Sequence, residues 1–227
     1  MKKILTLIMI ILILATGIAW AEKAKGWFEK GNSAMEAGYY NVAIECFEKA
    51  IAIDPDDSET HLRMGHVYNK KGNTKNAISS YKKAIAIDPD FARAHYSLGT
   101  VYDKKGKLGK AISEFKKSIA INPNLADAHR ELGSVYNEKK MYDEAVTELK
   151  RAVELDHNDS QAHSQIGIAY LAKGLNSAAA KHLYRAGLLF LGQGDREGAL
   201  KAYEGLKQTK SKELERNLSE KLYPELK

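Results

Sequence analysis

The sequence is short of cysteine and arginine, and each shortage excludes a class of protein. Its single cysteine, Cys46, rules out an internal disulfide and a zinc site built from cysteines. Only seven of the 35 basic residues are arginine, whose planar guanidinium is favoured in the recognition of phosphates and bases. Because the formal net charge is also only +6 in 227 residues, we expect no nucleic-acid partner.

Catalytic motifs are missing as well. The sequence contains no HExxH, GxSxG or phosphate-loop pattern, so it offers no recognisable metalloprotease, hydrolase or nucleotide-binding site. Gly192 and Gly194 follow a predicted helix rather than a strand, which argues against a dinucleotide-binding loop. We therefore expect a protein that is not an enzyme and that binds neither a cofactor nor a metal.

Residues 1–21 have the pattern of a secretory signal peptide. Two lysines precede an aliphatic run, residues 4–15, and the small residues Ala19 and Ala21 fit a cleavage site. Cleavage after Ala21 would leave a periplasmic or secreted protein. The alternative is an uncleaved inner-membrane anchor facing the periplasm, because residues 4–21 form an uncharged stretch of 18 residues. Membrane association would then arise through this leader.

What the sequence does contain is a unit of 34 residues that recurs along most of the chain. Three of the four prolines of the chain, Pro55, Pro89 and Pro123, lie one period apart. A fixed period of this length indicates one supersecondary unit stacked on itself, with each copy burying its apolar face against its neighbours. The same spacing separates five glycines: Gly31, Gly65, Gly99, Gly133 and Gly167.

Each period predicts two helices joined by short turns. In residues 58–91, apolar and small residues recur at helical spacing on both sides of Gly72 and Asn73, which interrupt the pattern. The second helix should end at Asp88, because the residue before a proline is disfavoured in the helical region. No stretch alternates apolar and polar residues as a half-buried strand would, so we expect an all-α protein.

This unit resembles the tetratricopeptide repeat, whose pattern is W-x2-L-G-x2-Y, then A-x3-F, then A and P. The second copy carries Gly65, Tyr68, Ala77 and Tyr81 at these places, whereas His157 replaces the proline of the fourth copy. With the leader, the resemblance implies an exported bacterial member of this family, folded as a right-handed α-solenoid of antiparallel helix pairs. The predicted copies are residues 24–57, 58–91, 92–125 and 126–159, together 24–159, and a degenerate fifth copy, 160–193.

The period slips after the fifth copy. A new copy fits a start near Ala180, so the helix around residues 177–191 would serve both the fifth copy and the next one. Residues 194–227 are then a partial repeat followed by a capping helix. Three leucines four residues apart form the apolar stripe of that helix: Leu214, Leu218 and Leu222.

The family resemblance implies a protein-binding groove lined by the first helix of each repeat. We therefore expect a scaffold or adaptor that binds a protein or peptide, within an envelope-associated assembly. The alternatives are a self-assembling structural protein, with the leucine stripe uncovered, or an accessory subunit of an envelope enzyme or of a secretion or pilus machine. The oligomeric state is not indicated. The expected groove residues are Phe28, Asn32, Leu62, His66, Asn69, Tyr96, Thr100, Asp103, Arg130, Ser134, Asn137 and Ile168.

Four histidines also keep the period, and they are candidates for either packing or metal binding. Equivalent residues on neighbouring helices lie on the order of 8–10 Å apart, too far for one zinc ion to bridge. We expect packing between repeats, with a pH-sensitive interface as the alternative. Cys46 stands where later copies have polar residues, and we expect it to be partly exposed. The histidines are His61, His95, His129 and His163.

Overall fold

The computed structural model describes the backbone of residues 2–223 and the side chains of residues 20–223, which form twelve helices and no strand. Residues 2–21 of the predicted signal peptide belong to the first helix. Only their backbone is described before residue 20, and the side chains there lie outside the described part. The helices are α1 (Lys2–Glu36), α2 (Tyr40–Ile53), α3 (Ser58–Lys70), α4 (Thr74–Ile87), α5 (Ala92–Lys104), α6 (Leu108–Ile121), α7 (Ala126–Glu138), α8 (Tyr142–Leu155), α9 (Ser160–Ala172), α10 (Asn176–Gly192), α11 (Arg196–Gln208) and α12 (Lys212–Leu222).

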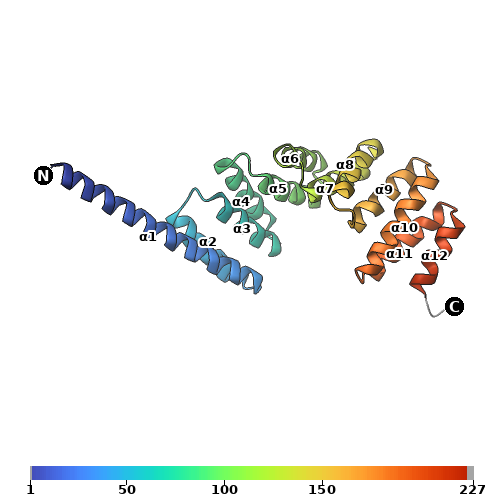
Figure 1. The fold of residues 1–227 in the computed structure, drawn as a ribbon, viewed down its shortest axis with the longest axis horizontal. Helices are drawn as coiled ribbons and strands as arrows, with labels where there is room; N and C mark the ends of the chain where they lie inside the picture. The colour runs from blue at the N-terminus through green and yellow to red at the C-terminus, as the bar shows by residue number, and fades with distance from the viewer. Residues whose placement is uncertain (1, 224–227) are drawn as a thin grey trace. The chain divides into compact units, whose positions relative to one another are not determined.

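Consecutive helices pack as antiparallel pairs, which confirms the predicted all-α class (Figure 1). The chain divides into two compact units, Met1–Val101 and Tyr102–Lys227. In the first unit α1 packs on α2 and α3 on α4, and in the second α7 packs on α8 and α9 on α10. Among residues 20–223, whose side chains the structure describes, no helical stretch is long and apolar enough to cross a membrane.

The helix boundaries follow from local chemistry. The carboxylate of Asp57 accepts a hydrogen bond from the Glu59 backbone N–H at the start of α3, and Asn73 caps α4 in the same way. Between these helices Gly72 adopts a φ of +75°, a left-handed conformation that glycine reaches without strain. Asp88, which precedes a proline, is extended and ends α4 as the sequence predicts.

Inside the helix pairs, a glycine of the first helix lies against a large side chain of the second. A Cβ added at Gly65 would stand 2.6 Å from Cδ1 of Tyr81, and one at Gly133 would stand 2.5 Å from Cγ of Leu149. No real side chain tolerates such distances, so the helices can approach this closely only at glycine. The same contact joins Gly31 to Phe47 and Gly167 to Leu183.

The C-terminal part closes on itself. Helix α10 packs against α9, α11 and α12, so it serves two neighbouring pairs, as the slipped period suggested. Leu218 and Leu222 of α12 are buried, and Leu214 packs against the same cluster. The predicted leucine stripe is therefore covered by the chain itself, which removes the exposed face that the self-assembly alternative required. Residues 224–227 of the predicted cap lie outside the described part.

The environment of Cys46 differs from the one expected from the sequence. We expected partial exposure, but the side chain is buried, with 7% of its surface exposed. It continues the stripe formed by Ala43, Phe47 and Ala50, which share its helix face at spacings of three and four residues. A disulfide to another molecule through this thiol would require α2 to move.

The glycine contact predicts a sharp difference between two glycine-to-alanine substitutions. Gly65→Ala should lower the free energy of unfolding by about 1–2 kcal/mol, because overpacking against Tyr81 outweighs the gain in helix propensity. Gly109→Ala is the matched control in α6, where an added Cβ meets nothing within 4 Å. It should leave stability unchanged or raise it by up to about 1 kcal/mol. Urea unfolding followed by circular dichroism measures both, and equal losses would contradict the packing argument.

Candidate functional site

The predicted groove residues all lie on the first helices of successive pairs: α1, α3, α5, α7 and α9. Eleven of the twelve are at least partly exposed, and Ile168 is 45% exposed. Leu62 is the exception, because its side chain is fully buried. The expectation that Leu62 lines a contact surface is therefore wrong, since it belongs to the core. We call the exposed sides of the odd-numbered helices the first-helix surface and describe it within each unit separately.

In the first unit this surface includes His66, on α3. Its Nε2 lies 3.0 Å from Oγ of Ser97, and its ring meets Tyr81 edge-on with centroids 5.5 Å apart. Burial lowers the pKa of His66 to about 4, and the nearby charges of Arg63 and Arg93 act in the same direction. His66 is thus neutral near pH 7, and the expected groove has a hydrogen-bonding imidazole here rather than a cation.

Other polar groups of the first unit differ in whether they already form hydrogen bonds or ion pairs within the chain. The hydroxyl of Thr100 donates to the backbone carbonyl of Tyr96, 3.1 Å away, so its proton is used within α5. The guanidinium of Arg93 pairs with Glu59 at 2.6 Å. By contrast, Oδ1 of Asn32 is buried and has no hydrogen-bond partner among the residues that the structure describes. Asn32 is the expected groove residue of this unit with an unused, buried acceptor.

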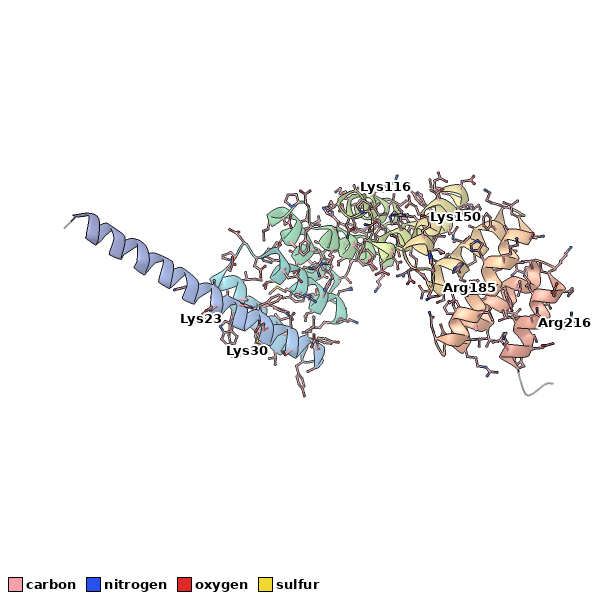
Figure 2. The ribbon with its side chains drawn as sticks, viewed as in Figure 1. Lys23, Lys30, Lys116, Lys150, Arg185 and Arg216 are labelled. Atoms are coloured by element: carbon pink, nitrogen blue, oxygen red, sulfur yellow. The ribbon has the colours of Figure 1, made fainter. Side chains whose placement is uncertain are left out.

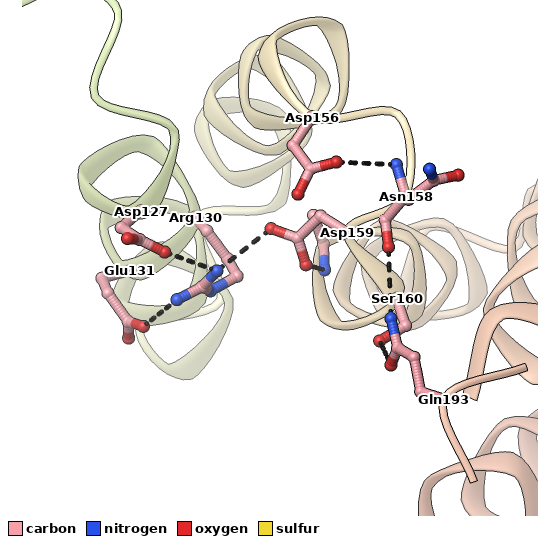
Figure 3. Close-up of polar contacts among 9 residues, drawn as sticks. Asp127, Arg130, Glu131, Asp156, Asn158, Asp159, Ser160 and Gln193 are labelled. Carbon is pink, nitrogen blue, oxygen red and sulfur yellow. Dashed lines mark hydrogen bonds and ion pairs between the residues drawn. The ribbon is translucent and has the colours of Figure 1, made fainter. Parts of the chain in front are cut away.

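In the second unit Arg130 is held by three carboxylates (Figure 3). Its guanidinium lies 2.8 Å from Asp127, 3.0 Å from Glu131 and 3.1 Å from Asp159. Asp159 also accepts from the Ala162 backbone N–H and so caps α9. Burial alone would lower the pKa of Arg130, but Asp159 and Glu131 outweigh it and raise the pKa. The charge of Arg130 is therefore neutralised within the protein and is not free for an incoming carboxylate.

Asn137, Asp103 and Ser134 are the other expected groove residues of this unit with polar side chains. Nδ2 of Asn137 donates to the backbone oxygen and to Oε1 of Gln165, each 3.0 Å away, while its Oδ1 is buried without a partner. Burial raises the pKa of the Asp103 carboxyl, and Glu138 and Glu131 add to the effect. Ser134 is partly exposed nearby on α7.

A hollow of about 780 Å³ lies between α9 and α11 on the first-helix surface. Ile168 and Leu171 of α9 face Leu200 of α11 across it, and Glu197 and Lys201 stand among the polar residues of its lining. The sequence pattern identified Ile168 but missed the α11 side chains, because the longer α10 shifts α11 by two residues from the 34-residue period. Allowing that shift places Leu200 where Ser164 stands in α9 and would have found it.

Basic side chains are spread over many helices rather than collected at one place. Figure 2 labels examples on α1, α6, α8, α10 and α12. Two of them repeat the same contact: Lys116 lies over the ring of Tyr136 at 5.8 Å, and Lys150 over Tyr170 at 5.9 Å. The Tyr136 hydroxyl accepts a hydrogen bond that raises the pKa of Lys116. These lysines thus contact aromatic side chains of their own chain.

The four repeated histidines are buried, as packing residues would be. Nε2 of His129 lies 3.1 Å from the carbonyl oxygen of Pro123, and His61 and His95 make the same contact six residues back. Nδ1 of His163 faces Nδ1 of His182 at 3.1 Å, and burial lowers the pKa of both. Within the described side chains, no group of three or more His, Cys, Asp or Glu residues is arranged to hold a metal ion.

The buried state of His66 predicts a specific titration. We expect its imidazole to titrate near pH 4 rather than at the ordinary 6.5, measured by NMR in the folded protein. Because the unfolded chain takes up this proton at the higher pH, stability should fall by about 2–3 kcal/mol as pH drops from 6.5 to 4. His66→Gln should remove that part of the pH dependence. A midpoint close to 6.5 would contradict the assignment.

The ion pairs of Arg130 predict that it is a structural residue. Arg130→Ala should lower the free energy of unfolding by about 2–3 kcal/mol, because Asp159, whose side chain is only 6% exposed, would lose its cation. Arg93→Ala serves as the control, since that side chain is 57% exposed and its single pair should contribute less than about 1 kcal/mol. Thermal unfolding of the two variants measures both changes in stability. Equal losses of stability in Arg130→Ala and Arg93→Ala would contradict the structural role of Arg130.

The comparisons with known proteins agree with this architecture. A model described as TPR repeat matches residues 31–72, 65–106, 101–140 and 133–174, and a tetratricopeptide repeat model matches residues 183–209. No curated protein matches the chain. A crystal structure of MamA is 30% identical, with a TM-score of 0.66, over 72% of this chain and 96% of that one.

Two further solved structures share the fold at lower identity. YrrB, described as a TPR protein with an unusual peptide-binding site, is 24% identical with a TM-score of 0.65, over 78% of this chain and 90% of that one. PilF of Pseudomonas aeruginosa is 18% identical with a TM-score of 0.66, over 88% and 98% of the two chains. From the family models, which together match more than half of its length, we conclude that the chain belongs to the tetratricopeptide repeat family.

Proposed function

We propose that the chain is a non-enzymatic scaffold that binds a peptide or a helix of a partner protein on its first-helix surface. Membership of the tetratricopeptide repeat family supports a protein or peptide partner in general. The observation that carries the more specific proposal is the hollow between α9 and α11, whose volume of about 780 Å³ is in the range of ordinary ligand pockets.

The chemistry of this hollow favours an apolar side chain of the partner. Ile168, Leu171 and Leu200 offer apolar surface that a partner would remove from water, at about 25 cal/mol for each Å² buried. The charged lining is largely balanced, because Lys201 pairs with Glu197 at 2.6 Å and Glu204 pairs with Lys207. A strongly charged partner therefore finds little attraction here.

We further propose that the scaffold acts in an envelope-associated assembly, in the periplasm or outside the cell. The support is the leader pattern of residues 1–21, and an inner-membrane anchor facing the periplasm is the alternative that the same residues allow. A role as accessory subunit of an envelope enzyme or of a secretion or pilus machine is compatible with the same binding surface. Self-assembly through α12 is disfavoured, because Leu218 and Leu222 are buried within the chain.

Peptide selection against the full chain tests the binding proposal. Random displayed peptides should enrich sequences with apolar side chains, and their affinity should fall at least about tenfold for an Ile168→Ser, Leu200→Ser double variant. Val42→Ser is the control, since this apolar side chain is 50% exposed on α2, far in sequence from the hollow. Fluorescence anisotropy measures the affinities. No enrichment, or equal affinity for both variants, would reject the proposal.

A further inference from the structure

A second hollow, of about 450 Å³, lies in the first unit between α2 and α4, which are the second helices of their pairs. Side chains of α3 also reach it, so it is bounded by three helices. Because it lies away from the first-helix surface, a ligand bound in it would be independent of the proposed peptide binding. The lining consists of Glu48, Ile51, Ala52, His61, Met64, Tyr68, Asn76, Ser79, Ser80 and Lys83.

The imidazole of His61 lines this hollow with one nitrogen unused. The residue is only 5% exposed, and its Nε2 lies 3.1 Å from the backbone oxygen of Pro55. Because a carbonyl oxygen only accepts, Nε2 carries the proton and donates it. Nδ1 is buried, and no group in the described part of the chain forms a hydrogen bond with it. A buried polar atom in this state is unfavourable by about 1–3 kcal/mol, which a suitable ligand would recover.

The other repeats show what normally stands opposite this nitrogen. The partner comes from the second helix, 19 residues after the histidine. In the fourth repeat Nδ1 of His129 lies 2.7 Å from Oε2 of Glu148, and in the fifth Nδ1 of His163 lies 3.1 Å from Nδ1 of His182. In the second repeat the equivalent residue is Ser80, whose short side chain leaves Nδ1 of His61 unpaired.

We propose that this hollow binds a carboxyl group from another molecule, in the place that Glu148 takes opposite His129. Because a carboxylate oxygen and the unprotonated Nδ1 of His61 are both acceptors, binding takes up one proton from water, and that proton forms the hydrogen bond between them. The donors in its wall suit a carboxylate, because Lys83 supplies a positive charge and Asn76, Ser79 and Ser80 supply N–H and O–H groups.

The rest of the lining fits the same ligand. The positive charge of Lys83 offsets the single negative charge of Glu48, so the charged lining does not repel a carboxylate as a second acidic residue would. Ile51 and Met64 form apolar wall for a short stem behind the carboxylate. The ligand is therefore a small carboxylic acid or an aspartate or glutamate side chain of a partner.

NMR of the full chain labelled at its histidines tests this proposal. Acetate is the probe for a free acid, and glutamate blocked as N-acetyl amide is the probe for a side chain. The His61 imidazole signals should shift and saturate with both, and blocked glutamate should bind at least about tenfold more tightly if a partner side chain is the source. Ethylammonium, the charge-reversed probe, should produce no saturating shift.

Two variants of α4 complete the test. Ser80→Glu provides the carboxylate from within the chain, so it should abolish the acetate response and raise the thermal unfolding temperature. Ala86→Glu adds the same charge at an exposed position of that helix and should leave the response unchanged. No saturating shift at His61 in the unmodified chain means that only water occupies the hollow, and this overturns the proposal. An equal response to ethylammonium, or an undiminished acetate response in Ser80→Glu, overturns it as well.

Discussion

The close contact between a glycine and a large side chain is the constraint on which the helix pairs depend. At Gly65 the ring of Tyr81 occupies the space that any Cβ would need, and at Gly133 the side chain of Leu149 does the same. A glycine inside a helix is unfavourable by roughly 1 kcal/mol relative to alanine, and the packing it permits outweighs that loss. Because this contact recurs, the helices of each pair approach one another in the same way. The repeats then differ in the side chains around the contact.

The buried histidines occupy the same position in their repeats but face different side chains. His129 and His61 each contact a backbone oxygen six residues back, so their rings are held in the same way. The group facing Nδ1 is a carboxylate in the fourth repeat, an imidazole in the fifth and only Ser80, too short to reach it, in the second. The residue on the second helix thus separates a repeat in which a carboxylate contacts Nδ1 from one in which Nδ1 lies beside a hollow.

On the first-helix surface, an arginine forms its ion pairs within the chain. Arg130, an expected groove residue, is neutralised by Asp127, Glu131 and Asp159, and one of these carboxylates also caps a helix. What is left for a partner is the apolar surface between α9 and α11. Recognition by this family member is therefore expected to rest on apolar side chains rather than on ion pairs.

The all-α class, the helix pairs and most turns could be predicted from the amino-acid sequence, because periodicity, Gly72 and the Asp88–Pro89 step act within a few residues of the chain. Which side chains of those helices are exposed to a partner depends on how the helices pack. The burial of Leu62, the pairing of Arg130 with Asp159 and the hollow that Leu200 completes depend on neighbouring helices. Such neighbours lie about one repeat away in sequence, and their exact register, shifted after α10, is set by packing rather than by local pattern.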